Sequence, residues 1–306
     1  MELVFAISDK GGTGRSVTSC NLAYRRACQG DDVAYLDFDF GSPTAGAIFE
    51  IVDVETGAKS GGLHSYLRGR VTDLHRLDVW ARSDRRDLRA GLHNAGTLVL
   101  FPGDRGGGEF PWEPDVIDRC VKLFLRLSEE FEFCFVDLSA GRSHALDAML
   151  EVTSRAELSA MTARWLVYHR WTRQHILAAR ELVFGGKGVL ETGVAYKHDE
   201  AVLRDSIRFV RTAVVDLNSP DLPDGPPAQV MWRQDCDRDL QERARKYQLG
   251  KSAMLGQTPM DPVLQWREQL ITDTDVTAKH IANAATLEAF DDLARGLTDE
   301  SAWDTV

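Results

Sequence analysis

The sequence lacks any hydrophobic run near the roughly 20 residues that a membrane-spanning helix requires. The first apolar segment, residues 3–7, begins almost at the N-terminus and leaves no room for a signal peptide before it. We therefore expect a cytoplasmic protein that does not insert into a membrane.

The sequence also lacks any CxxC pair. Its five cysteines are Cys20, Cys28, Cys120, Cys134 and Cys236. An odd number of isolated cysteines is typical of reduced, buried thiols rather than of a disulfide framework or a thiolate metal site.

Positive charge is scarce. Lysine and arginine number 36 against 47 acidic residues, so the formal net charge is −11, which as a whole repels nucleic acid. One local exception lies within 203–214, where three arginines fall on one side of a predicted helix and apolar residues on the other. This stripe is either a nucleic-acid surface on a dimer or an ordinary solvated helix face. Its members are Arg204, Arg208 and Arg211.

A glycine-rich segment follows the first predicted strand and runs directly into a predicted helix that ends near Gly30. A strand that turns through glycines into a helix presents backbone N–H groups and a helix N-terminus to one point, which favours a polyphosphate. The usual motif ends in Gly-Lys-Ser/Thr; here Arg15 replaces that lysine, and an extra Lys10 precedes the glycines. The predicted cradle comprises Gly11, Gly12, Thr13, Gly14, Arg15, Ser16 and Val17.

Carboxylates end two further predicted strands. Residues 33–40 end in Asp37 and Asp39, and residues 131–138 end in Asp137, with Gly141 shortly after. Because the carboxyl ends of parallel strands face the ligand crevice of an open sheet, we expect these side chains near the glycine loop. The alternative is that an aspartate only caps the turn that follows it.

These segments resemble the deviant Walker A loop (KGGxGKS/T), the DxDxxG switch I and the Walker B strand of the ParA/MinD family of dimerising ATPases. The resemblance implies that Lys10 reaches the partner's nucleotide across a homodimer and that Asp39 positions the attacking water. It also implies that ATP is bound with Mg²⁺ and that the Gly141 amide senses the γ-phosphate. The implied magnesium residues are Ser16, Asp37 and Asp137. Specific matches cover residues 3–46 and 131–141.

Later segments match the same family more loosely. In that comparison Arg233 and the turn from Pro259 to Asp261 lie beside the adenine base. Both turn residues are equally consistent with an ordinary turn. The family's membrane-bound members end in a basic amphipathic helix, whereas residues 297–306 here are acidic, so we expect no membrane partner.

The order of strand and helix patterns predicts an α/β fold, a mostly parallel twisted sheet flanked by helices on both faces, as in P-loop NTPases. We expect one nucleotide-binding domain over residues 1–298 with loop insertions near 53–62, 103–114 and 216–228, and an acidic tail at 299–306. The second glycine cluster, 185–188, has no preceding strand and no following Ser/Thr, so we predict a helix stop there.

Three functional hypotheses follow. The first is an ATP-dependent dimerisation switch that positions or regulates a partner protein. The second is a nucleotide-binding scaffold that has lost hydrolysis, because the wide guanidinium of Arg15 replaces a compact ammonium. The third is an ATP-dependent synthetase acting on a small molecule, which Lys10 disfavours because a trans-acting lysine serves a nucleotide held between subunits. The sequence does not identify the partner.

Overall fold

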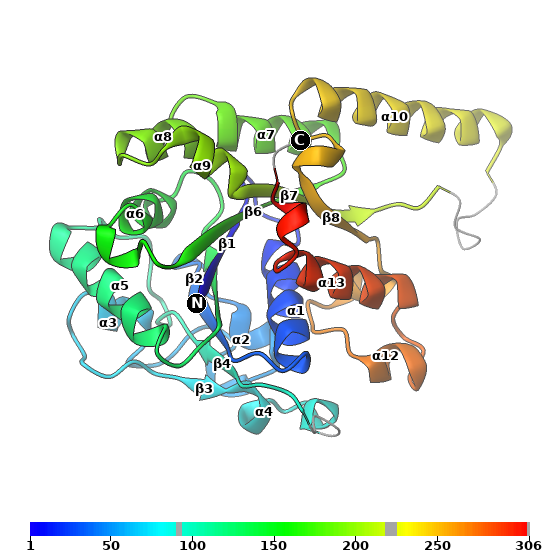
Figure 1. Ribbon diagram of the computed structural model, residues 1–306. Coiled ribbons are helices and arrows are strands. Elements are labelled where there is room, and N and C mark those ends of the chain that lie inside the picture. Colours follow the sequence, from blue (N-terminus) through cyan, green and yellow to red (C-terminus); the bar gives the residue numbers. More distant parts are fainter. Residues whose placement is uncertain (90–93, 218–224, 305–306) are drawn as a thin grey trace.

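A computed structural model describes residues 1–89, 94–217 and 225–304 (Figure 1). Within these residues the strands form one eight-stranded sheet in the order β3-β4-β2-β5-β1-β6-β7-β8, and every pairing is parallel except β3 with β4. The strands are β1 (Glu2–Ile7), β2 (Val33–Phe38), β3 (Leu77–Asp78), β4 (Leu98–Phe101), β5 (Phe133–Leu138), β6 (Thr162–Arg170), β7 (Ile207–Val214) and β8 (Met254–Pro259).

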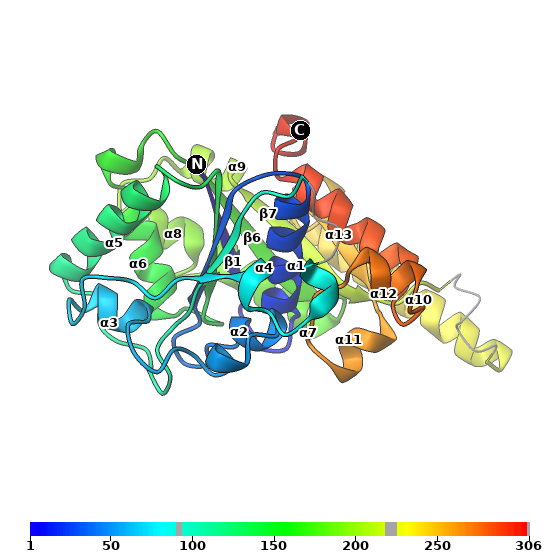
Figure 2. The same cartoon turned by 90° about the horizontal axis from the view of Figure 1, so that it is seen from below.

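Helices cover both faces of this sheet, as expected (Figure 2). Since β1, β2 and β5 are flanked on both sides, their residues are almost all buried, and apolar side chains pack in two separate clusters. One face carries α3 (Leu63–Leu67), α5 (Pro114–Leu127), α6 (His144–Thr153), α7 (Arg173–Phe184), α8 (Val189–Ala195) and α9 (Glu200–Asp205). The other carries α1 (Arg15–Cys28), α2 (Ala45–Ile48), α4 (Val79–Arg82) and α13 (Ala284–Gly296), with α11 (Pro262–Trp266) and α12 (Asp273–Thr277) nearby.

The register brings the predicted carboxylates together. Asp37 of β2 lies directly opposite Asp137 of β5, and β5 in turn pairs with β1, which leads into the glycine loop. The predicted helix stop at residues 185–188 is also confirmed, because Gly185 is the C-cap of α7.

The predicted arginine stripe is wrong. Arg204 lies on α9, but Arg208 and Arg211 lie on strand β7 and are 4% exposed. Arg211 stacks on Trp171 with 3.8 Å between the guanidinium carbon and the ring centre. Strand β7 is buried on both faces, with Ile207 and Phe209 in one apolar cluster and Val210 in the other, so its apolar residues do not alternate with polar ones and partly match a helical period.

The C-terminal segment closes one end of the sheet. Trp303 is 4% exposed, and its ring lies under Arg164 and Arg208 at 4.2 and 5.2 Å. Its indole N–H donates to the Gly296 carbonyl at 3.0 Å. Trp303 therefore packs against its own chain, and its cation–π contacts and its burial hold the C-terminal segment in place.

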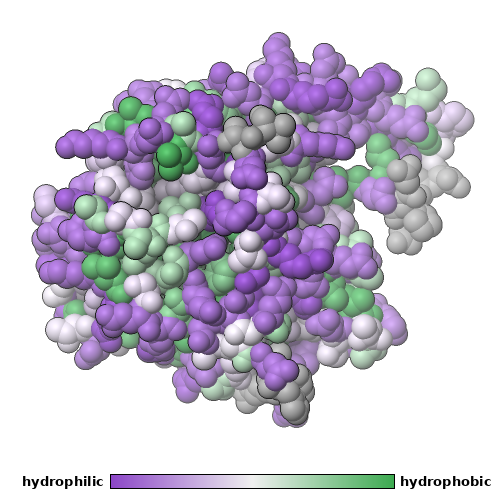
Figure 3. Space-filling model, viewed as in Figure 1, coloured by the Kyte–Doolittle hydropathy of each residue, from purple (hydrophilic) through white to green (hydrophobic). Residues whose placement is uncertain are grey.

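Helix α10 (Pro227–Lys246) projects beyond the rest of the molecule (Figure 1). Ala244 is its one buried residue, whereas Met231 and Trp232 are 63% and 65% exposed. Elsewhere on the face seen in Figure 3, polar side chains cover most of the surface. The loop prediction for 216–228 falls partly on residues 218–224, outside the described residues.

None of the described helices is long and apolar enough to cross a bilayer. All five cysteines are free thiols, three of them buried and two, Cys28 and Cys236, partly buried.

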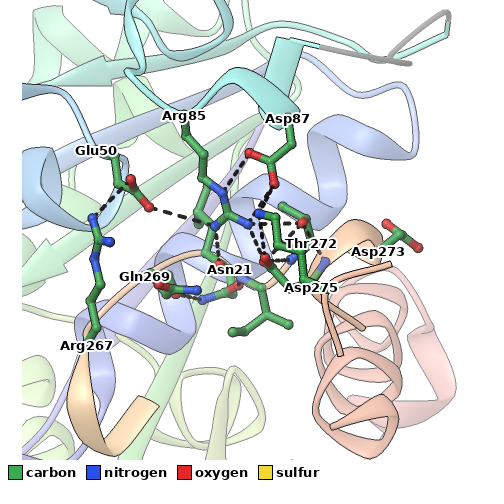
Figure 4. A network of polar contacts seen from close by, with 12 residues as sticks. Asn21, Glu50, Arg85, Asp87, Arg267, Gln269, Thr272, Asp273 and Asp275 are labelled. Carbon is green, nitrogen blue, oxygen red and sulfur yellow. Dashed lines mark hydrogen bonds and ion pairs between the residues drawn. The ribbon is translucent and has the colours of Figure 1, made fainter. Parts of the chain in front are cut away.

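A buried polar network joins the middle of the chain to its C-terminal part (Figure 4). Arg85 donates to the Leu270 carbonyl at 2.6 Å and to the carboxylates of Asp87 and Asp275, the last of which is completely buried. Asn21 of α1 extends the network, because its side chain bonds the backbone of Gln269 and Ile271 at 3.1 and 2.7 Å. The network fixes the segment after β8 against α1.

We predict that Arg85→Ala lowers the free energy of unfolding by about 3 kcal/mol, because it leaves Asp275 buried with only the partly exposed Lys279 as a counter-charge. Urea denaturation measures this. The exposed neighbour Arg86 is the control, and Arg86→Ala should change stability by less than about 0.5 kcal/mol. Equal effects of the two substitutions would contradict a structural role for the Arg85 network.

Asp87 makes part of this stability depend on pH. Burial alone would raise its pKa, but hydrogen bonds from Arg85 and Lys279 outweigh burial and lower the pKa to about 2. A carboxylate with a depressed folded-state pKa stabilises the fold above its unfolded pKa, about 3.9, and that contribution is lost as the pH falls toward the folded pKa.

We therefore expect the wild type to be more stable than Asp87→Asn by about 1 kcal/mol near pH 6, with solvent screening taken into account. The difference should shrink as the pH falls from about 4 to about 2. Thermal or urea unfolding across this range tests the prediction, with the exposed substitution Asp118→Asn as control. A difference that stays constant with pH would refute it.

Candidate phosphate and nucleotide site

The glycine loop between β1 and α1 has the conformation that the sequence predicts. Gly12 and Gly14 have φ angles of 72° and 76°, in the left-handed region that residues with a Cβ rarely adopt. Gly14 is the N-cap of α1, and its carbonyl accepts the N–H of Thr18 at 2.9 Å. The first turn of α1 therefore opens onto the loop, with its unpaired N–H groups and positive dipole end available to an anion.

A cavity of about 610 Å³ lies at this end of α1. The structure brings together the predicted cradle and Asp39 on its wall, and adds residues of α2, the ends of β6 to β8 and α11. Figure 2 shows α2 and α11 at the same end of α1. The predicted residues on the wall are Gly11, Gly12, Thr13, Gly14, Arg15, Ser16, Val17, Asp39, Pro259 and Asp261.

Arg15 is the centre of the site. Its Nε donates to Asp137 Oδ1 at 2.5 Å, and one terminal nitrogen donates to Asp39 Oδ2 at 2.7 Å and to Ser16 Oγ at 3.3 Å. The other terminal nitrogen lies 3.5 Å from Ser8 Oγ. Arg15 is 6% exposed, so a charged fork joins the carboxyl ends of β2 and β5 inside the protein.

The charges in this site depend on one another. Burial raises the pKa of Asp137, while the adjacent Arg15 charge opposes that rise. Burial disfavours the charged form of Arg15 as well, but Asp137 and Asp39 outweigh it and raise the arginine pKa. Because a buried charge without a partner is costly, Arg15 and Asp137 each require the other.

Asp37 has a structural role here. Its Oδ2 accepts the N–H of Ala45 at 3.0 Å and its Oδ1 accepts the N–H of Asp39 at 3.3 Å, so it holds the turn that leads into α2. Burial, with Asp137 opposite, raises its pKa well above the usual value. The alternative that an aspartate caps the following turn therefore describes Asp37.

The predicted magnesium ligands do not form a free ligand set in this structure. Ser16 and Asp137 contact Arg15, and Asp37 accepts backbone N–H groups. Among the described residues no group of three or more His, Cys, Asp or Glu side chains is arranged to hold a metal ion. The residues present do not fit a preformed metal site.

Two other predicted residues lie at the edge of the loop. Lys10 is exposed to solvent and is not on the cavity wall, so its ammonium is open to a second molecule. The N–H of Gly141 donates to the Ser8 carbonyl at 2.7 Å, so that amide does not face the cavity in this conformation.

The base end of the predicted site is only partly assembled. Pro259 and Asp261 line the cavity, but Asp261 is 1% exposed and its carboxylate bonds Val263, Asn283 and Thr286. Asp261 thus caps α11 and ties it to α13. Arg233 lies on α10 and is not on the cavity wall, so the structure does not bring it to the predicted base.

The structure adds residues that sequence analysis missed. Arg170, the last residue of β6, lines the cavity, and Thr212 and Ala213 line it from β7. Ala213 has a φ of 51° within an irregular stretch of β7, and its N–H lies 3.4 Å from Thr258 Oγ1. Residues at the ends of parallel strands could have been suspected from the same rule that singled out the aspartates.

Solved structures with this architecture were found by comparison. The chain matches the MinC:MinD cell division protein complex of Aquifex aeolicus with 16% identity, 97% of this chain and 95% of that chain covered, and a TM-score of 0.61. It matches a putative plasmid partition protein from Borrelia burgdorferi bound to AMPPNP with 12% identity, coverages of 98% and 99%, and a TM-score of 0.60. A septum site-determining MinD with Mg-ADP from Pyrococcus horikoshii matches with 16% identity, coverages of 98% and 96%, and a TM-score of 0.52.

The predicted fold is thereby confirmed as that of the MinD and ParA-type P-loop ATPases. No protein-family model matches the sequence, and no curated protein gives a significant match.

We predict that Arg170→Ala weakens binding of inorganic tripolyphosphate about tenfold, or about 1.4 kcal/mol, because it removes a cation from the cavity wall. Isothermal titration calorimetry measures the affinity. Arg173→Ala, an exposed position in the first turn of α7, is the control and should bind as the wild type does. Equal losses in both variants would show that only general charge matters.

Proposed function

We propose that this protein is an ATP-binding switch that dimerises on its nucleotide and positions or regulates a partner protein. The observation that carries the proposal is the conjunction of the left-handed glycine loop, the open start of α1 and the solvent-exposed Lys10 beside them. Loop and helix can hold the phosphates of one nucleotide. An exposed lysine next to them can reach a nucleotide bound to a second copy.

The cavity supports a whole nucleotide rather than a phosphate alone. It extends from the glycine loop to Pro259 and to Leu264 and Gln265 of α11, so one wall offers N–H donors and cations and the other offers apolar and amide groups. That division suits a charged triphosphate at one end and a base at the other. The neighbours of this fold hold AMPPNP and Mg-ADP, which supports the same ligand class.

The proposed biological role is to place or regulate another protein. Two structural neighbours act, by their names, in cell division and plasmid partition, and one is a complex with a second protein, MinC. We propose a role of this kind with a protein partner.

The contacts of Asp39 bear on whether the bound nucleotide is hydrolysed. The carboxylate of Asp39, which we assign to the attacking water, accepts a hydrogen bond from Arg15 at 2.7 Å within an ion pair. A general base or water-positioning group must be free to contact the water. This contact favours a second candidate function, a nucleotide-binding scaffold with little or no turnover.

We predict that Lys10→Ala binds AMPPNP within about an order of magnitude of the wild type, about 1.4 kcal/mol, yet fails to dimerise with it. The reason is that Lys10 lies outside the cavity of its own chain. Sedimentation velocity with AMPPNP, with ADP and without nucleotide measures the dimer. Lys122→Ala, an exposed lysine on α5, is the matched control and should dimerise normally.

Two results separate the candidates. If the Lys10 variant forms the dimer as well as the wild type does, the dimerisation switch is rejected and the nucleotide-binding scaffold is retained. Absence of nucleotide binding in the wild type would remove both.

A further inference from the structure

The resemblance to the ParA/MinD family assigns four side chains to the metal ion or the attacking water. The guanidinium of Arg15 contacts all of them except Asp37. Arg15 holds Asp137 at 2.5 Å, Asp39 at 2.7 Å and Ser16 at 3.3 Å. These oxygens come from the ends of β5 and β2 and from the first turn of α1. Arg15 therefore occupies the point where their oxygens converge.

A guanidinium can serve as a fixed cation at such a point. It stays charged at any relevant pH, and it presents five N–H donors in a planar fork. Nε and one terminal nitrogen hold the protein oxygens, while the other terminal nitrogen has, among the described residues, a single contact at 3.5 Å to Ser8 Oγ. Since Arg15 also lines the cavity, that nitrogen can donate to a phosphate oxygen.

Asp37, the remaining predicted magnesium ligand, already has partners for both of its carboxylate oxygens. Asp37 is 2% exposed, and both of its oxygens accept backbone N–H groups. A divalent ion bound directly to Asp137 or Asp39 would therefore compete with the Arg15 guanidinium for a carboxylate, and displacing Arg15 would leave a desolvated charge without a partner.

We propose that Arg15 provides the cation of this site, so that the nucleotide binds without a divalent metal ion. This inference rests on the proposed nucleotide binding. It distinguishes the chain from a P-loop with lysine at this position, because a lysine has one nitrogen and cannot hold Asp137 and Asp39 through two separate nitrogens.

The test is the affinity for a fluorescent ATP analogue in millimolar magnesium and in excess EDTA. For the wild type the two dissociation constants should agree within about threefold, less than about 0.7 kcal/mol. For Arg15→Lys, which frees Ser16 and one carboxylate, binding should be at least about tenfold tighter with magnesium. A wild-type affinity that falls tenfold or more in EDTA would overturn the proposal.

Arg25→Lys is a closely matched control. Arg25 lies on the same helix and also bridges two carboxylates, Asp273 and Asp291, at 2.9 and 2.6 Å, but it is outside the cavity. Its variant should show the metal independence of the wild type. If nucleotide binding depends on magnesium in both lysine variants, the dependence comes from a general loss of stability, and the proposal is contradicted.

A second measurement does not depend on the variant folding. Water proton relaxation with Mn²⁺ reports a metal held in a protein–nucleotide complex. Adding wild-type protein to Mn²⁺ and AMPPNP should give no enhancement beyond free nucleotide, and a clear enhancement would overturn the proposal. If no nucleotide binds with or without metal, the proposed function fails; if it binds only with metal, this inference alone fails.

Discussion

The ion pairs of Arg15 with Asp137 and Asp39 are the interaction on which the site depends. Strands β1, β5 and β2 lie side by side, so the loop after β1 and the aspartates after β5 and β2 meet at one edge of the sheet. Two acidic side chains so close inside a protein repel each other and are costly to desolvate. The guanidinium offsets both effects and links the start of α1 to Asp39 and to Asp137 of β5.

Helix α1 connects the Arg15 ion pairs with the segment that follows β8. Its first turn carries Arg15, its middle carries Asn21, and its end carries Arg25, which is paired with Asp273 and Asp291. The Asn21 contacts, together with those of Arg85, hold the segment that follows β8 (Figure 4). Residues of α11 in this segment line the cavity opposite the glycine loop. Both ends of the cavity thus contact α1 or a segment that α1 holds in place.

Much of the fold and of the loop could be predicted, because the signals are local. The apolar strand before the glycines, the helix from Arg15 and the aspartates at strand ends follow from short stretches of sequence. Segment 203–214 was misassigned because arginine pairing with Trp171 and Trp303, both distant in sequence, allows a strand with buried charges. Propensity and period carry no information on such partners. Arg233 lies on α10 and outside the cavity, and no local signal in the sequence shows where a helix with so little buried surface lies relative to the glycine loop.

By itself the sequence determined the order of strands and helices, the glycines whose positive φ forms the loop, and the residue types that surround it. These depend on backbone sterics and on the alternation of apolar and polar residues. Only the tertiary structure decided what the charged residues do. In the folded chain Arg15 donates to Asp137 and Asp39. Asp37 accepts from backbone N–H groups, and Asp261 accepts from backbone N–H and hydroxyl groups. The reason is that the cost of burying a charge depends on which opposite charge or hydrogen-bond donor lies within reach. Those distances are set only when the chain folds.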